Sequence, residues 1–211
     1  MGIGEDIVMT PTVRALPPER LPDVVDVMAD AFAEYPLMLH LVGPEGDVSV
    51  RVRALVDLFV SRRLRRGGPM FGVVDPDSGR LAGATILTLP GEPAPSEEWL
   101  AWQQTRWETL GADTKARYDH YAGLWPSLEA TPHHHLNMIG MRRDFAGRGW
   151  ARPLLEHVVA LAAEDPASSG VTLTTEVPRN VELYRYFGFQ IVGRQSVTAA
   201  LETWGFFRPK R

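Results

Sequence analysis

The chain has 211 residues, 45% of them hydrophobic, and a formal net charge of −4. This composition predicts a single globular domain, and the acidic balance argues against nucleic acid as the main partner. The sequence contains no cysteine, which excludes disulfides, thiolate metal ligands and a cysteine nucleophile.

The first ten residues, 1–10, are expected to form a loose leader. They lack the basic and then apolar pattern of a signal peptide. The sequence has no apolar run of about 18 residues, the length at which a transmembrane helix is expected. We therefore expect a cytoplasmic protein that binds no membrane. Arginine far outnumbers lysine, a bias that indicates a GC-rich, bacterial genome rather than a function.

The first third of the chain is predicted to be mainly helical, because apolar residues recur there with helical spacing. Pro36 separates two of the helices, and Asp47 or Ser49 is placed to cap the third. The arginine-rich run 62–66 falls at the C-terminal end of that helix, where cations suit the helix dipole. An RNA-binding patch is the alternative interpretation of this run. We expect a strand over 12–16 and helices over 19–34, 37–42 and 50–65.

The rest of the chain alternates strands and helices. Turn-forming residues at 75–79 are expected to join two strands into an antiparallel hairpin. Ser96 is placed to cap the first of two aromatic-rich helices, whose rings we expect mostly in the core and partly around a pocket. Strands are expected over 70–74, 81–89, 136–141, 171–175, 189–197 and 200–207, and helices over 96–110, 114–124, 154–162 and 180–187.

The order of these elements predicts the fold class. The strand over 136–141, the helix after it and the strand over 171–175 form a natural right-handed βαβ unit with parallel strands. Hairpins precede and follow this unit. We therefore expect an α/β fold, with a mixed and mostly antiparallel sheet around one central parallel βαβ unit, in one domain over residues 1–211.

A short loop with two glycines, Gly147 and Gly149, leads from the first strand of this unit into its helix. Such a loop suits phosphate binding, because glycine permits close approach and the first N–H groups of a helix point outward without partners. It is not a Walker A motif, since no Lys-Ser or Lys-Thr follows it. The third glycine of a dinucleotide-binding motif would fall at Arg152. The loop alone therefore does not identify its ligand.

Residues that follow the next strand narrow the choice of ligand for this loop. With them, the chain resembles the GNAT superfamily of acetyl-CoA-dependent N-acetyltransferases from residue 12 onward. The matching features are the strand end 139–141, the loop 146–151, Asn180, Tyr184, Gly188 and Phe189. Three further segments, 31–36, 177–180 and Thr203-Trp204, are similar to the branch of puromycin N-acetyltransferase.

The resemblance implies acetyl-CoA as cosubstrate and no metal. Loop N–H groups would hold the pyrophosphate, the parallel strands would splay apart around the pantetheine arm, and Asn180 would hold that arm. The Met141 N–H would polarise the thioester carbonyl, and Gly140 would let the strand bulge there. Ala146 departs from the usual Gln or Arg. The residues implied for acetyl-CoA binding are Ile139, Gly140, Met141, Arg142, Arg143, Ala146, Gly147, Arg148, Gly149, Trp150, Ala151, Asn180 and Tyr184.

Catalysis in this family implies an acid for the departing thiolate and a base for the amine. Tyr184 would be the acid, since a phenol is a reasonable proton donor to a thiolate. On a strand, His133 and His135 share one face and His134 takes the other. The alternative interpretation is that these histidines are polar residues at the start of a strand with no role in the site. A metal site is disfavoured. Candidate bases are His134, His135, Glu34, Glu176 and Glu202, and candidate acceptor contacts are Phe32, Tyr35 and His134.

We therefore expect an N-acetyltransferase that acts on the amine of a small molecule through a ternary complex, as a monomer or homodimer. The segment 91–131 is expected to be a helical insertion over the acceptor side. Such a lid argues against the open groove that acetylation of a protein lysine or N-terminus needs. A third hypothesis is an acyl-CoA-binding regulatory module without turnover. Ala146 supports this hypothesis, and Tyr184 argues against it.

Overall fold

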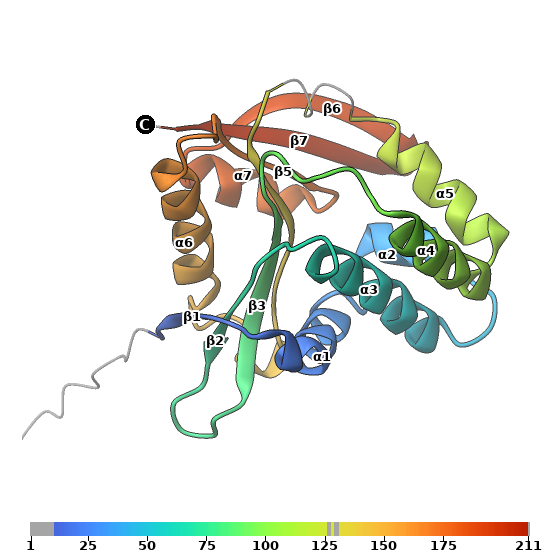
Figure 1. Ribbon diagram of the computed structural model, residues 1–211, viewed down its shortest axis with the longest axis horizontal. Coiled ribbons are helices and arrows are strands. Elements are labelled where there is room, and N and C mark those ends of the chain that lie inside the picture. Colours follow the sequence, from blue (N-terminus) through green and yellow to red (C-terminus); the bar gives the residue numbers. More distant parts are fainter. Residues whose placement is uncertain (1–10, 126–127, 129–130, 211) are drawn as a thin grey trace, which may run out of the picture.

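The computed structural model describes residues 11–125, 128 and 131–210, so the leader expected over 1–10 lies outside it. Within these residues the chain forms a seven-stranded sheet of order β1-β2-β3-β4-β5-β7-β6, with helices on both faces (Figure 1). Neighbouring strands run antiparallel except β4 and β5, which are parallel. The predicted fold class is confirmed. The strands are β1 (Val13–Ala15), β2 (Met70–Val74), β3 (Leu81–Thr88), β4 (His134–Met141), β5 (Gly170–Thr175), β6 (Gln190–Thr198) and β7 (Leu201–Pro209).

The helices begin and end close to the predicted positions. Two predicted caps are confirmed, since Asp47 accepts a hydrogen bond from the Val50 N–H and Ser96 accepts one from the Trp99 N–H. The helices are α1 (Leu21–Ala31), α2 (Pro36–Val42), α3 (Val48–Leu64), α4 (Glu97–Leu110), α5 (Ala112–Ala122), α6 (Ala151–Glu164) and α7 (Pro178–Tyr186).

Two of the differences in helix boundaries affect the site. Helix α1 ends at Ala31, so the next residues form a turn instead of a last helical turn. Helix α7 begins at Pro178, whose missing N–H is tolerated in a first turn. Asn180 therefore lies inside α7 and does not cap it, which corrects the expected boundary.

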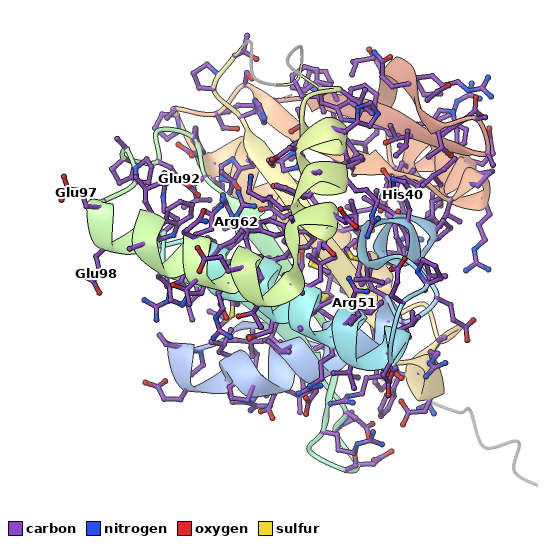
Figure 2. The ribbon with its side chains drawn as sticks, turned by 90° about the vertical axis from the view of Figure 1, so that its right-hand side faces the viewer. His40, Arg51, Arg62, Glu92, Glu97 and Glu98 are labelled. Carbon is purple, nitrogen blue, oxygen red and sulfur yellow. The ribbon has the colours of Figure 1, made fainter. Side chains whose placement is uncertain are left out.

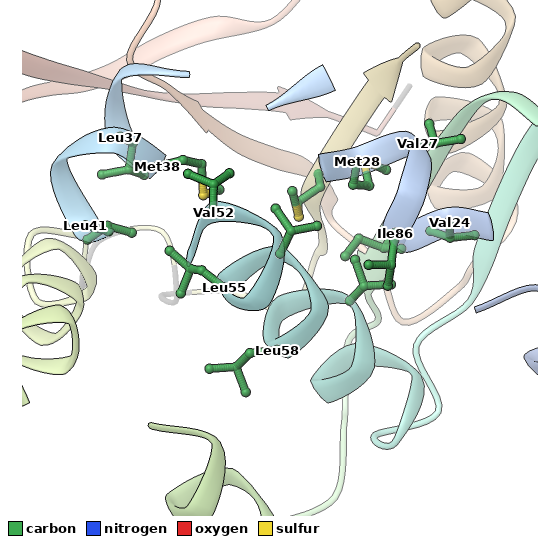
Figure 3. Packing of buried hydrophobic residues seen from close by; sticks show 14 of the residues in the cluster. Val24, Val27, Met28, Leu37, Met38, Leu41, Val52, Leu55, Leu58 and Ile86 are labelled. Carbon is green, nitrogen blue, oxygen red and sulfur yellow. The ribbon is translucent and has the colours of Figure 1, made fainter. Parts of the chain in front are cut away.

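Two hydrophobic clusters hold the helices against the sheet. On one face, α1, α2 and α3 bury side chains such as Met28 and Leu55 against Ile86 of β3 (Figure 3). On the other face, α6 packs Leu154 and other apolar residues onto β4 and β5. Each fully buried aliphatic side chain contributes roughly 1.5–3 kcal/mol of transfer free energy. The central strands are therefore fixed between two apolar layers.

Strand β4 contains a bulge at Asn137. Met138 lies opposite Ile86 and Leu136 lies opposite the next residue, Leu87, so Asn137 is the extra residue. Because an extra residue reverses the alternation of faces, Leu136 packs in the α6 cluster whereas Met138 packs in the α1 cluster. The bulge thereby places these two side chains on opposite faces of the sheet, although they lie two residues apart.

The bulge is not at Gly140, where we expected it. Gly140 pairs regularly with Ala84. Its missing side chain has a different use, because a Cβ there would lie 2.7 Å from the Cβ of Ala31. Glycine at this position lets α1 pack directly on β4, and α1 leads into the turn that carries Phe32 and Tyr35.

Strands β4 and β5 diverge as expected. Their parallel register joins His134 to Val171 and His135 to Thr172, and within the described strands it goes no further. Beyond these pairs, β4 continues along β3 to Met141, and β5 continues along β7 to Thr175. The sheet therefore opens between the carboxyl ends of its two parallel strands.

Candidate active site

A cavity of about 240 Å³ lies at this opening. The strands supply His135 and its neighbours from β4 and Leu173 and Thr174 from β5. Phe32 and Tyr35 line it from the α1–α2 turn. Helices α3, α5 and α7 close the remaining sides. Side chains from seven elements that are distant in sequence thus surround one space.

Glu176, the first residue after β5, is 4% exposed and lies at the centre of a hydrogen-bond network. Its Oε1 accepts hydrogen bonds from Tyr121 Oη at 3.0 Å and from Thr203 Oγ1 at 2.6 Å. Its backbone N–H donates to Tyr35 Oη at 3.1 Å. Burial raises the pKa of the Glu176 carboxyl, although these hydrogen bonds act in the opposite direction. Glu176 is therefore a better proton acceptor than an ordinary carboxylate.

Tyr184, on α7, lines the cavity with its ring packed against Phe189 and Phe206. Burial, and secondly the negative charge of Glu176, raise the pKa of the Tyr184 phenol to about 12. The hydroxyl is therefore protonated throughout the neutral range. A protonated phenol on the cavity wall can act as a hydrogen-bond donor.

Thr175 connects two of the predicted site residues. Its hydroxyl lies 3.1 Å from Tyr35 Oη and accepts a hydrogen bond from Asn180 Nδ2 at 3.2 Å. The α1–α2 turn and α7 are thereby held to the end of β5. This arrangement orients the Tyr35 ring and the Asn180 amide at the cavity wall.

The three consecutive histidines separate as the strand alternation predicts. His135 lines the cavity, and its Nδ1 lies 2.8 Å from Thr172 Oγ1. Burial, with smaller effects from His133 and Arg63, lowers the pKa of His135 to about 4, so its imidazole is neutral at pH 7. His135 is therefore a weak base, suited to holding a ligand by a neutral hydrogen bond.

His134 lies on the opposite face of β4, outside the cavity lining. Its Nδ1 is 3.0 Å from Ser168 Oγ, and its Nε2 is 3.6 Å from a carboxylate oxygen of Asp165. These partners come from the loop between α6 and β5. We therefore remove His134 from both the candidate bases and the candidate acceptor contacts.

Two further candidate bases also lie away from the cavity. Glu34 is exposed and stands 3.6 Å from the guanidinium of Arg143. Glu202 pairs with Arg194 across the β6–β7 hairpin. Neither lines the cavity, so Glu176 and His135 are the candidates that the fold brings to it.

The glycine loop before α6 has the backbone geometry expected of a phosphate cradle. Gly147 and Gly149 have φ angles of 79° and 76°, in the left-handed region that favours glycine, and the space beside each Cα is open. Helix α6 begins at Ala151 without a side-chain cap. Within the described residues, no backbone acceptor is bonded to the N–H groups from 147 to 151. These groups and the helix dipole together favour an anion.

Arginines near this loop are partly tied to the protein. Arg142 donates to the carbonyl of Leu81, and Arg143 bonds Asp30 of α1 through both its backbone N–H and its side chain. Arg148 lies over the ring of Trp150, which stacks on the core. Of these three arginines, Arg148 lies within the loop itself. Its guanidinium donates to the carbonyl of Asp144 at 3.3 Å, and the described residues provide no carboxylate within 4.0 Å of it.

The Met141 N–H points into the opening between the strands. The next N–H along β4, that of Arg142, donates to the carbonyl of Ala82 on the β3 side. Because N–H groups alternate in direction along a strand, those of Met141 and Ile139 face the β5 side, where the parallel pairing has ended. A carbonyl oxygen in the opening would meet these donors.

Several cavity residues were not singled out from the sequence. Tyr121 and Tyr118 belong to the aromatic-rich helices, for which a partial pocket role was expected. Arg62 carried no such indication, since it becomes part of the site through the packing of distant elements. Thr203 bonds Glu176 without lining the cavity, and only the resemblance had singled it out. Arg62 in particular was assigned to a solvated helix end, yet it lines the cavity.

The fold and this site together define an acetyltransferase. The model of the Acetyltransferase (GNAT) family matches residues 53–189, more than half of the chain, so the chain belongs to this family. It is an N-acetyltransferase, and the family uses acetyl-CoA as cosubstrate. Among the described residues, no cluster of three or more His, Asp or Glu side chains is placed to hold a metal ion. None of the described helices has both the length and the apolar character to cross a membrane.

Solved structures share the whole fold at low identity. A Corynebacterium glutamicum protein described as histone acetyltransferase HPA2 and related acetyltransferase has a TM-score of 0.69 at 20% identity, with 96% of this chain and 98% of that chain covered. Drosophila melanogaster polyamine N-acetyltransferase, which forms N-acetylagmatine, has a TM-score of 0.61 at 17% identity, with coverages of 93% and 97%. Aedes aegypti arylalkylamine N-acetyltransferase 2 has 0.58 at 15%, with 93% and 96%. At these identities the likeness concerns the fold alone.

Proposed function

We propose that this chain transfers the acetyl group of acetyl-CoA directly to the amine of a small molecule. The observation that supports the proposal most strongly is the pairing of Glu176 and Tyr184 on the wall of one cavity at the strand opening. A buried carboxylate with a raised pKa and a protonated phenol are the base and the acid that such a transfer needs.

The residues of the glycine loop and the strand opening fit acetyl-CoA as cosubstrate. N–H groups from Gly147 to Ala151 would hold the pyrophosphate, with Arg148 adding positive charge. The gap between β4 and β5 would take the pantetheine arm, and Asn180 would bond it. The N–H of Met141 would hold the thioester carbonyl oxygen and stabilise the charge that develops there. Ile139, Gly140 and Trp150 would shape this channel.

In the transfer we propose, Glu176 accepts a proton from the acceptor ammonium, directly or through water. The neutral nitrogen then forms the C–N bond as the C–S bond breaks. Tyr184 donates its hydroxyl hydrogen toward the departing thiolate, and the second amine proton restores the phenol through solvent. His135, with its low pKa, would contribute a neutral hydrogen bond to the acceptor instead of acting as the base.

Glu176 and Tyr184 would act in sequence. A phenol with a pKa near 12 is a poor match for a thiolate with a pKa of roughly 8.5. The charge of Glu176 is one of the two causes of that high value. When Glu176 has taken the amine proton, this charge is gone and the pKa of Tyr184 falls. Deprotonation of the acceptor would therefore make Tyr184 a stronger acid just before the thiolate leaves.

A small-molecule acceptor is favoured by the cover over the cavity. The segment 91–131 contains α4 and α5, which lie across this side of the molecule (Figure 2). Tyr118 and Tyr121 of α5 line the cavity, which would hinder entry of a folded protein surface. We propose that this segment is a lid within a single domain. The small amines named for two structural neighbours agree in class with this acceptor.

We also propose that the chain belongs to the branch of puromycin N-acetyltransferase and works in the bacterial cytoplasm as a monomer or homodimer. What supports the branch is the position of the similar segments. The segments 31–36 and 177–180 supply Tyr35 and Asn180, which meet at Thr175, and Thr203 bonds Glu176.

A thiol-release assay with acetyl-CoA and separate panels of small amines and peptides tests the proposal. We expect CoA release with at least one small amine and none above background with peptides that present lysine or a free N-terminus. Release with peptides alone would replace the proposal by protein acetylation. Acetyl-CoA binding by calorimetry without release in either panel would favour a regulatory module.

A further inference from the structure

We infer that the acceptor is an amino acid or a close analogue, whose acidic group is bound by Arg62 while its amine faces Glu176. This inference rests on the proposed function and names the substrate class of the same site. Arg62 of α3 and Glu176 after β5 both line the cavity, one cationic and one anionic. A ligand with both charges would complement both side chains.

Arg62 has a buried donor without a partner. Its Nη1 donates to the Tyr118 hydroxyl at 2.6 Å, whereas its buried Nε has no hydrogen-bond partner in the described structure. Buried donors are rarely left unpaired, because the desolvated group loses about 1–3 kcal/mol. The guanidinium lies beside the α4–α5 pair (Figure 2), and Arg62 lines the cavity, so a shift of this side chain toward the cavity would let a ligand there supply the acceptor.

Arg62 also lacks a counterion, unlike the other arginines that bend inward from the end of α3. Arg63 and Arg66 share the carboxylate of Glu92. The exposed Arg65 lies over the ring of Trp102, 4.6 Å from its centre. For Arg62, the described residues provide no carboxylate within 4.0 Å and the hydroxyl of Tyr118 carries no charge. The cavity wall therefore presents a positive charge that the protein does not neutralise.

Helix α5 contacts both charged side chains. Tyr118 bonds Arg62, and Tyr121 bonds Glu176. Residues three apart lie on one face of a helix, about 4.5 Å apart along its axis. Arg62 and Glu176 are thus held by neighbouring tyrosines, yet they form no ion pair with each other in the described structure. A small molecule that carries both an ammonium and an acidic group is therefore not excluded from binding both side chains by an ion pair between them.

The body of the acceptor is expected to be apolar. The cavity is also lined by the rings of Phe32, Phe59 and Tyr35. Such surfaces favour an aliphatic or aromatic side chain. A carboxylate is the acidic group best suited to Arg62, because one edge of a planar guanidinium binds a carboxylate through two parallel hydrogen bonds.

Matched acceptor pairs test the inference. Apolar and aromatic amino acids are compared with the same molecules lacking the carboxylate, with their amides, and with the aminophosphonates. We expect the amino acids to have kcat/KM at least tenfold above the decarboxylated amines and the amides. Faster turnover of the phosphonates than of the amino acids would overturn the choice of carboxylate.

Arg62→Gln supplies the second readout, with Arg65→Gln as the control. Both variants remove one positive charge from the end of α3, but Arg65 is exposed and outside the cavity lining. Loss of a charged hydrogen-bond partner corresponds to a roughly 10- to 100-fold loss. We expect Arg62→Gln to raise KM for the amino acid by that factor and to change the decarboxylated amine less than threefold. Arg65→Gln should leave both acceptors within twofold.

Two outcomes separate this inference from the proposed function. Turnover of decarboxylated amines as fast as of amino acids, with Arg62→Gln affecting both equally, would overturn the inference and leave the acetyl transfer intact. Failure to release CoA with any small amine would overturn the proposed function, and the inference with it. Binding of the N-acetylated amino acid product, measured by calorimetry, compares the unmodified chain with Arg62→Gln without turnover.

Discussion

Tyr121 of α5 donates a hydrogen bond to Glu176, which follows β5, across 3.0 Å. The contact joins the helical cover of the cavity to the end of the strand that forms its floor. Tyr121 is partly buried there, and burial, followed by the charge of Glu176, raises the pKa of its phenol well above 10. It therefore remains a donor and fixes the carboxylate at one orientation. Any acceptor that reaches Glu176 does so beside this contact.

The first prediction concerns Glu176→Gln, which keeps the shape but removes the base. We expect kcat to fall at least about 100-fold at neutral pH, within the range typical of general bases. In the unmodified chain, kcat should fall as the pH drops through the raised pKa of Glu176, because the protonated carboxyl cannot accept a proton. That acid limb should be missing in the variant. The measurement is a pH profile of CoA release.

Glu34→Gln is the matched control, because Glu34 is exposed and lies away from the cavity. It should retain the activity and the acid limb of the unmodified chain. Retention of more than a third of kcat by Glu176→Gln would assign the base elsewhere, with His135 as the next candidate to replace.

The second prediction concerns Tyr184→Phe. Removal of the hydroxyl should lower kcat roughly 10- to 100-fold and leave the KM for acetyl-CoA unchanged, because the proton is needed only when the thiolate departs. Tyr186→Phe, a change on the same helix at a side chain that is 70% exposed, serves as control and should have no effect. A fall in kcat of less than threefold in Tyr184→Phe would refute the role of general acid.

Sequence periodicity predicted the elements and the strand order of the βαβ unit because these depend on local patterns. The loop, Asn180 and Tyr184 were found through a resemblance that spans neighbouring elements. The position of the bulge was not predictable in this way, since it depends on the register between β3 and β4, where Asn137 is extra. The place of Arg62 in the cavity wall was likewise not predictable. The sequence assigns this residue only to the C-terminal end of a helix, and its role depends on the packing of α5 over it.

His134 and His135 also show that the sequence alone does not predict which side chain reaches the cavity. Their alternation was predicted from strand geometry, but which of them faces the cavity depends on which helix covers each face of the sheet. Packing of α6 and its following loop on the His134 side leaves His135 facing the cavity. Tertiary packing, not strand propensity, therefore selects the candidate histidine.

The third prediction concerns Gly149→Arg. The space beside the Gly149 Cα is open in the protein itself, so the folded state should survive the strain of a φ angle of 76°. The long side chain would occupy the space in front of the loop N–H groups. We expect acetyl-CoA binding, measured by calorimetry, to weaken at least about tenfold, which is a loss near 1.4 kcal/mol.

Gly79→Arg supplies the control for backbone strain and charge. Gly79 has a φ angle of 69° and open space beside it, and it belongs to the β2–β3 turn. This variant should bind acetyl-CoA like the unmodified chain. Equal affinities for Gly149→Arg and Gly79→Arg would remove the loop from the proposed binding site.

The fourth prediction concerns the stability of the fold in acid. The pKa of His135 is about 4 in the folded chain and about 6.5 when unfolded, so between these values the unfolded state binds more protons. The free energy of unfolding should therefore decrease as the pH falls from 6.5 to 4, by at most about 3 kcal/mol from this group. His134 acts in the same direction, since burial also lowers its pKa. Urea unfolding of His135→Asn at a series of pH values should show a shallower decrease than the unmodified chain. The exposed His120→Asn should keep the original slope, and an unchanged slope in His135→Asn would contradict the buried, neutral state of this imidazole.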